Sequence, residues 1–176
     1  AEVDAAIGVV GAAKTRGSKI ADELTHRLID HLTGEAGGVQ HDPRSIFKLY
    51  LALGKHARAG DTALVIARTE QESGKYGKAH DTLLEAFTML AENGVRVPSE
   101  LARTLELLHS YILVKRLVAL GDHTGAAHML KRVVSSLSQF EKHSVQILTS
   151  AVIECQRAGL KKSSFQLASQ LMRPEN

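Results

Sequence analysis

The sequence is poor in cysteine, tryptophan and proline, with one, none and three of these among its 176 residues. One cysteine cannot form an internal disulfide, and a chain of this length buries roughly 70% of its unfolded surface without such a crosslink. Sparse cysteine also indicates a reducing compartment. The absence of tryptophan, with only four phenylalanines, argues against a base-stacking surface for single-stranded nucleic acid.

Charge of one sign and long apolar runs are also scarce. The 22 Lys and Arg residues and 19 Asp and Glu residues leave a net charge of +3. This balance argues against nucleic acid or an acidic membrane surface as a partner. No apolar run approaches the roughly 20 residues of a membrane span, because SYILVKRLVAL is interrupted by Lys115 and Arg116. There is no signal-peptide pattern. We therefore expect a soluble chain without membrane insertion.

The residues that are present favour helices. Ala, Leu, Glu, Lys and Gln are abundant and no run alternates Val, Ile or Thr with polar residues, which predicts an all-α fold. Asp42 and Pro43 are a typical N-cap and first helical residue. The pattern predicts helices at residues 2–14, 18–33, 43–53, 55–73, 75–93, 99–120, 123–138 and 141–158, and a shorter one at 160–172.

A recurring turn is the most informative feature. GKHARA (54–59), GKYGKA (74–79) and GDHTGA (121–126) each place glycine before a helix and alanine five residues later. AGLKKSSF (158–165) is a weaker copy with serine in the alanine position. Glycine can adopt the positive φ that ends a helix, and alanine lets the next helix pack closely. Such turns are typical of tetratricopeptide-type hairpins.

The turns are irregularly spaced. Their glycines are 20, 47 and 38 residues apart rather than following the tetratricopeptide period of roughly 34. We therefore predict one domain, residues 1–176: a degenerate tetratricopeptide-like α-solenoid of eight to nine helices arranged as antiparallel hairpins.

Apolar stripes along three helices predict which residues are buried. The predicted core positions are Tyr76, Ala79, Leu83, Phe87 and Leu90, then Leu101, Leu105, Leu108 and Ile112, and then Ala126, Leu130, Val133 and Leu137. A polar strip on the helix at 99–120 consists of Ser99, Arg103, Glu106 and Ser110. We expect this strip to face solvent or a groove.

GVVGAAKT, from Gly8 to Thr15, nearly matches the phosphate-binding pattern G-x-x-x-x-G-K-[ST]. Ala13 replaces the second glycine, which hinders close approach of the backbone to a phosphate, and no strand precedes the segment. We interpret it as a small-residue helix that packs against a neighbour.

Histidines and acidic residues form no convincing metal site. His26 and His31 are five residues apart, as are His123 and His128, so the members of each pair point to different helix faces. Asp22, His26 and Asp30 share a face, but a fourth ligand is not evident. We interpret this row as a solvated stripe and expect neither a metal nor another cofactor.

Cys155 has two readings. A lone cysteine with a histidine elsewhere can be a catalytic nucleophile. Here Val145, Leu148 and Val152 form an apolar stripe that Cys155 continues. His143 lies twelve residues earlier, roughly 18 Å along the helix axis, and cannot act as the base by itself. We predict that Cys155 is a packing residue beneath the final helix, whose apolar positions are Leu160, Phe165, Ala168 and Met172.

Basic residues occur in adjacent pairs: Lys115 and Arg116, Lys131 and Arg132, and Lys161 and Lys162. Neighbours on a helix diverge, so these pairs do not form one stripe by sequence alone. We interpret them as solvated ends on buried aliphatic stems. The fold could still stack Arg116 and Lys131 in space.

Three long segments resemble a known family. IARTEQESGKYGKAHDTLL, LHSYILVKRLVALGDHTGAAHMLKRV and ILTSAVIECQRAGLKKSSFQLASQLMRPE are similar to the tetratricopeptide-like C-terminal region of the WD-repeat subunits of intraflagellar transport complex A. Strings such as HSYILVK and LMRPE are too idiosyncratic for shared helix bias. The resemblance continues more loosely through KIADELTHRLIDHL and IFKLYLAL and covers most of the chain.

The resemblance implies a role without catalysis. In that family, WD-repeat propellers precede the helical region and a cysteine-rich, zinc-binding module follows it. Because neither is in this sequence, which starts at Ala1 without a methionine, we expect a fragment of a longer protein. The family implies a scaffold for retrograde ciliary transport and for entry of membrane cargo, on the cytoplasmic side of the cilium or flagellum and at the basal body. Its partners would be other subunits of the complex, with no small-molecule ligand.

Other classes of function stay open at this point. The chain could be a helical-repeat scaffold of vesicle-coat type or an RNA-binding repeat, although it shows neither a regular period nor a basic inner face. It could also be a hydrolase acting through GVVGAAKT or Cys155. We favour the scaffold because a solenoid offers an extended surface. The predicted contact residues are Arg103 and Glu106, followed by Arg116 and Lys131.

Overall fold

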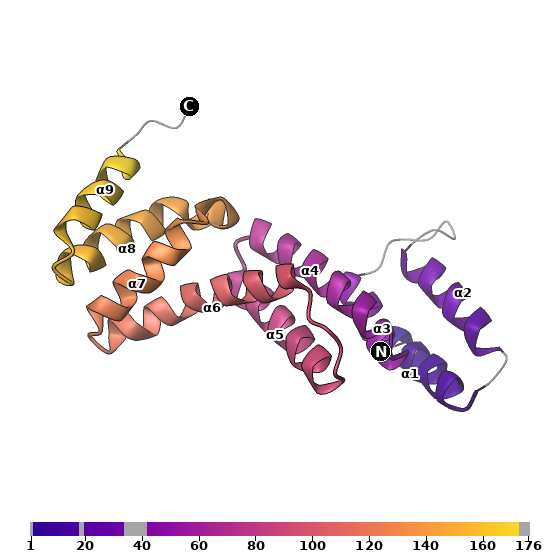
Figure 1. Cartoon of the computed structure of the whole chain (residues 1–176). Coiled ribbons are helices and arrows are strands. Elements are labelled where there is room, and N and C mark those ends of the chain that lie inside the picture. The colour runs from indigo at the N-terminus through magenta and orange to yellow at the C-terminus, as the bar shows by residue number, and fades with distance from the viewer. Residues whose placement is uncertain (1, 18–19, 34–41, 173–176) are drawn as a thin grey trace. The chain divides into compact units, whose positions relative to one another are not determined.

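The computed structural model describes residues 2–17, 20–33 and 42–172, and regular structure within these ranges is helical throughout (Figure 1). The α-helices are α1 (Glu2–Thr15), α2 (Ala21–Thr33), α3 (Pro43–Ala52), α4 (His56–Glu72), α5 (Tyr76–Glu92), α6 (Ser99–Ala119), α7 (His123–Val134), α8 (Ser144–Arg157) and α9 (Lys161–Leu171), with a 3-10 helix, η1 (Leu137–His143), before α8. The prediction of an all-α fold built from successive helical hairpins is confirmed. No described helix is long and apolar enough to cross a membrane.

The chain divides into two compact units. Unit 1 consists of Ala1–Ala67 and Thr82–Leu101, and unit 2 of Arg68–Asp81 and Ala102–Asn176. The division falls within α4, α5 and α6 rather than in a linker. The assignment of residues 1–176 to one domain stays a prediction.

Unit 1 has a core between α1, α2 and α3. Ile7, Val10, Leu32 and Leu49 are buried there, and apolar side chains of the same three helices pack around them. The Asp42 side chain accepts a hydrogen bond from the Arg44 backbone N–H, so it caps α3 as predicted. An ion pair at 2.8 Å between Lys48 Nζ and Asp4 Oδ1 also links α3 to α1.

In unit 2, α7 packs against α8, and α8 packs against α9 (Figure 1). The Ser164 hydroxyl of α9 donates a hydrogen bond to the Val152 carbonyl of α8. Buried side chains of α7 and α8 form the interior of this stack: Ala126, Ala127, Leu130, Val133, Ile147, Leu148 and Ala151.

The recurring turn adopts the conformation that its sequence predicts. Its glycines, Gly54, Gly74, Gly121 and Gly159, have φ values of 65°, 73°, 76° and 75°. The alanines five residues after the first three glycines are fully buried at Ala59, Ala79 and Ala126. The small residue is therefore required by packing, because a larger side chain there would push adjacent helices apart.

The prediction of continuous helices at 123–138 and 141–158 is wrong at their junction. Helix α7 ends at Val134, and η1 occupies Leu137–His143 before α8 begins. Within η1, Phe140 has φ −128° and ψ 40° and is fully buried. Its ring centroid lies 5.0 Å from that of Tyr76 and 5.1 Å from that of Tyr111. Burying this ring favours a break in the helix over continued helical hydrogen bonding.

Most of the predicted core positions are buried, with exceptions at the ends of the stripes. Phe87, Ile112 and Leu137 are only half-buried. Ser110 was assigned to the polar strip of α6, and that prediction is wrong because its residue is 3% exposed. Its hydroxyl donates a hydrogen bond to the Glu106 carbonyl, which lets a polar side chain be buried within the helix.

Candidate functional site

Two of the predicted contact residues lie together in unit 2. Arg103 and Glu106 of α6 line a surface hollow of roughly 230 Å³ with Arg132, Ser135 and Ser136 from the end of α7. Arg132 Nη1 donates a hydrogen bond at 2.7 Å to Glu106 Oε1, and both side chains are more than half exposed. We call this surface the α6–α7 hollow.

The other two predicted residues lie outside this hollow. Arg116 follows Arg103 by thirteen residues on α6, which separates them by roughly 20 Å along the axis. Lys131 is exposed on α7, next to Arg132 but about 100° away around the helix. Arg132 itself was missed as a contact residue, because the register between α6 and α7 cannot be read from the sequence.

The α6–α7 hollow suits polar recognition rather than catalysis. An exposed ion pair such as Glu106 with Arg132 contributes little to stability, since water competes for both charges. Either charge can therefore exchange its partner at low cost when another protein binds. The two serines add hydroxyl groups around the hollow.

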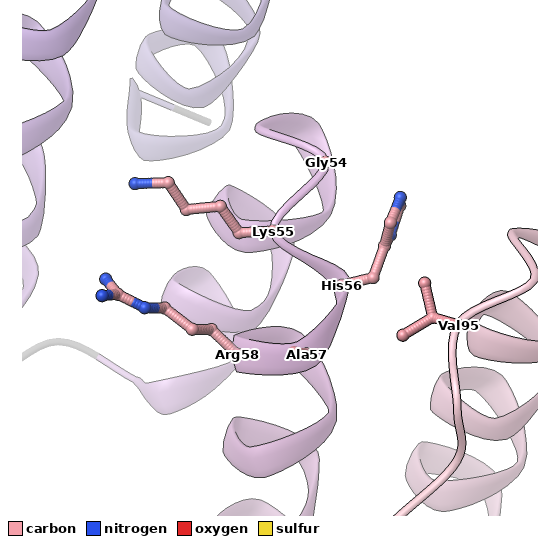
Figure 2. Close-up of a pocket in the computed structure, with 6 residues that line it drawn as sticks. All are labelled: Gly54, Lys55, His56, Ala57, Arg58 and Val95. Atoms are coloured by element: carbon pink, nitrogen blue, oxygen red, sulfur yellow. The ribbon is translucent and has the colours of Figure 1, made fainter.

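A second hollow lies in unit 1 and is basic. Its volume is roughly 430 Å³, and Gly54, Lys55, His56, Ala57, Arg58 and Val95 line it. Figure 2 shows the Lys55 and Arg58 side chains extending to one side of the turn, while His56 lies on the side of Val95. The Arg58 guanidinium carbon lies 6.0 Å from the centroid of the Tyr50 ring. Composition had suggested no such site, because the overall charge is nearly balanced.

The segment GVVGAAKT is part of α1, as interpreted from the sequence. A Cβ placed on Gly11 would lie 3.3 Å from the Ala52 Cβ, so the small residue permits close packing. Thr15 Oγ1 donates a hydrogen bond to the Gly11 carbonyl, and Lys14 Nζ lies 2.6 Å from Asp22 Oδ1. The lysine and threonine of the phosphate-binding pattern are therefore engaged within unit 1.

Asp22, His26 and Asp30 follow one another on α2. Lys14 donates to the Asp22 carboxylate and lowers its pKa, while His26 Nδ1 contacts the Asp22 backbone carbonyl at 2.7 Å. Within residues 2–17, 20–33 and 42–172, no group of three His, Cys, Asp or Glu side chains is placed to hold a metal ion.

Cys155 is a packing residue, as predicted. Its side chain is fully buried in unit 2, and burial raises the pKa of the thiol, which disfavours the nucleophilic thiolate. The predicted stripe is wrong at one end, because Val145 is 61% exposed while Glu154 is buried. The Glu154 carboxylate lies 2.7 Å from His123 Nδ1 and 3.0 Å from Arg157 Nη1. These two contacts compensate a charge that sequence alone would place at the surface.

A thiol-reactivity measurement tests this burial. We expect Cys155 to resist modification by dithionitrobenzoate in the native protein at pH 7.5 and to react stoichiometrically in guanidinium chloride. The buried thiol is both inaccessible and protonated. Rapid stoichiometric modification under native conditions would contradict the packing role and reopen a thiol-based activity.

Comparison with known proteins gives the relationship of this chain. No family model matches it. WD repeat-containing protein 19 of Mus musculus and of Homo sapiens are each 49% identical to it over 174 residues, 98% of the chain. The chain is homologous to a segment of WD repeat-containing protein 19. WD repeat-containing protein dyf-2 of Caenorhabditis elegans is 40% identical over 94% of the chain. The resemblance seen in the sequence is thereby confirmed.

The matched segment is a small part of WD repeat-containing protein 19. The chain spans about 12% of the length of each of these relatives. WD repeats form four-stranded blades, whereas regular structure in the described part of this chain is helical. The segment shared with WD repeat-containing protein 19 is therefore a helical region distinct from WD-repeat blades.

Proposed function

We propose that this chain is a non-enzymatic scaffold segment of intraflagellar transport complex A. Its helical hairpins hold neighbouring subunits during retrograde ciliary transport and during entry of membrane cargo. It acts on the cytoplasmic side of the cilium or flagellum and at the basal body. The observation that carries this proposal is the 49% identity with a helical segment of WD repeat-containing protein 19 across nearly the whole chain.

The candidate catalytic groups support a scaffold by what they do in the fold. Cys155 is buried in unit 2, and the phosphate-loop-like segment is an ordinary helix with its lysine paired to Asp22. Both side chains that could have supported a hydrolase are thus used for packing or local pairing. Exposed charged side chains on helices are instead suited to contacts between proteins.

The α6–α7 hollow is the proposed contact surface. Arg103 and Glu106 present opposite charges on one helix face, and Arg132 extends that face to α7. A partner that offers one acidic and one basic group can replace the exposed pair without leaving a charge unpaired. Arg116 and Lys131 are proposed as a further contact region, separate from this hollow.

Binding to single subunits tests the proposal. We expect the chain to co-elute on size exclusion with at least one other subunit of complex A. The double variant Arg103→Glu with Glu106→Arg reverses both charges at constant net charge and should weaken that binding tenfold or more. The matched control is Lys161→Glu with Lys162→Glu, two exposed residues on α9. It should bind within twofold of the unaltered chain.

Two outcomes would contradict different parts of the proposal. Co-elution that survives charge reversal would remove the α6–α7 hollow as the contact while leaving the scaffold intact. Failure to co-elute with every subunit of complex A would overturn direct contact by this segment.

A further inference from the structure

Two copies of the recurring turn have the same backbone but different surroundings. In the turn at Gly54–Arg58, the N–H groups of Gly54 and Lys55 donate to the carbonyls of Leu51 and Tyr50. In the turn at Gly74–Lys78, the N–H groups of Gly74 and Lys75 donate to the equivalent carbonyls of Gln71 and Glu70. Both are Schellman-type helix ends with a glycine at positive φ. Any difference in what covers them therefore comes from side chains.

The turn at Gly74–Lys78 is covered by η1, within unit 2. Tyr76 is 2% exposed, with its ring centroid 5.0 Å from Phe140 and 4.8 Å from His143. A Cβ placed on Gly74 would lie 3.4 Å from Lys142 Cβ, so η1 lies directly on the glycine. The Gln71 side chain also donates a hydrogen bond to the Gln139 carbonyl. A short segment with one aromatic anchor thus fills the space beside this turn.

The turn at Gly54–Arg58 is open at the surface. The hollow of roughly 430 Å³ occupies the space beside it, within the 300–1,000 Å³ range of ligand-sized pockets. Its aromatic position holds His56, which is half-buried, where the covered copy has Tyr76. His56 Nδ1 lies 3.0 Å from Met89 Sδ, which fixes the ring beside the apolar Val95 side of the hollow.

The charge of the open turn is also less compensated. In the covered copy, Glu70 Oε2 lies 3.8 Å from Lys75 Nζ. The position equivalent to Glu70 is Tyr50, which has no carboxylate to offer Lys55. Asp22 is close enough for Lys55 to lower its pKa slightly, but its carboxylate is already held by Lys14. Lys55 and Arg58 therefore present two positive charges to the hollow.

We propose that the turn at Gly54–Arg58 is a docking site for a short acidic segment of a partner protein. The segment places an apolar side chain beside Val95 and His56, and carboxylates beside Lys55 and Arg58. It occupies the open turn as η1 occupies the covered one. This site lies in unit 1 and is distinct from the α6–α7 hollow, although its biological setting rests on the proposed scaffold function.

The spread of the charges favours an extended acidic segment over a single phosphate group. Lys55 and Arg58 extend on one side of the turn and His56 lies on the other, so the three side chains do not converge on one point (Figure 2). One compact ion would leave part of the hollow unfilled. Two or more carboxylates along a chain, with an apolar residue between them, match both the charged and the apolar walls.

Peptide binding tests this site. The probe is a fluorescein-labelled peptide of sequence Glu-Glu-Asp-Phe-Glu-Glu-Asp, measured by fluorescence anisotropy at 50 mM and 500 mM salt. We expect binding at low salt that weakens at high salt. The variant Lys55→Glu with Arg58→Glu should raise Kd at least tenfold. The control Lys161→Glu with Lys162→Glu makes the same change in net charge on α9 and should leave Kd within twofold.

Further variants separate this site from general charge attraction. Lys55→Gln with Arg58→Gln should raise Kd at least threefold, and circular dichroism checks that its helices are intact. Replacing the peptide's phenylalanine by serine should also raise Kd threefold or more. Equal weakening by the α9 control, or unchanged binding in both turn variants, would overturn the proposal.

Binding of another ligand class would also overturn it. Vesicles containing phosphatidylinositol phosphates are the comparison probe. If they bind through Lys55 and Arg58 while the acidic peptide does not, the turn recognises a lipid headgroup instead. Because these variants leave Arg103 and Glu106 unchanged, failure here is distinguishable from failure of the subunit-binding experiment.

Discussion

Phe140→Ala is expected to lower the free energy of unfolding by about 3–5 kcal/mol, the range for removing a fully buried phenylalanine ring. Phe140 is 0% exposed and packs against Tyr76 and Tyr111 in unit 2. Its loss removes the anchor that holds η1 against the turn at Gly74–Lys78. The Tyr111 hydroxyl, 2.7 Å from His143 Nδ1, would lose part of the packing that positions it.

Phe165→Ala is the matched control because it removes the same side chain from α9, where the residue is 74% exposed. Its cost should stay within about 0.5 kcal/mol. Urea denaturation followed by circular dichroism measures both variants against the unaltered chain. Similar stability losses for the two variants would show that η1 is not anchored by Phe140.

Leu83→Ala should lower the free energy of unfolding by about 2–5 kcal/mol through lost burial and the cavity left behind. Leu83 is fully buried on α5 in unit 1. The predicted stripe on this helix places it on the inner face with Leu90, which is also fully buried. Leu90 in turn packs against Gly60 of α4, where a Cβ would lie only 3.2 Å from its Cδ1 atom.

The adjacent residue offers the control. Leu84 is 45% exposed on the opposite face of α5, so Leu84→Ala removes the same atoms from the same helix with far less burial. Its cost should be less than half that of Leu83→Ala. Helix propensity changes identically in both variants, so their difference in urea midpoint reports burial alone. Equal midpoints would contradict the assigned inner face of α5.

The helices and their turns could be predicted because their causes are local. Asp42 caps α3 through its own side chain, and each turn glycine adopts a positive φ that other residues avoid. The buried alanines at Ala59, Ala79 and Ala126 follow from the same turn pattern. Cys155 was also placed correctly, since apolar neighbours at helical spacing indicate a core position.

The candidate contact surfaces could be predicted only in part. Arg103 and Glu106 share a helix face, which sequence spacing shows, but their neighbour Arg132 comes from another helix. The basic hollow at Gly54–Arg58 was missed because its residues had been read as one copy of a turn. Its openness depends on what else packs beside that turn, and the turn sequence does not contain that information.

The sequence by itself determined the all-α class, the glycine-ended turns and most buried stripes, because hydrogen bonding within a helix and the periodicity of apolar residues are local properties. Only the tertiary structure decided where α7 stops, which acidic side chain is buried, and which turn is covered. Phe140 leaves the helix and Glu154 enters the core because residues more than thirty positions away, including Tyr76 and His123, surround them. Contacts between distant segments depend on helix register and packing, which local pattern does not encode.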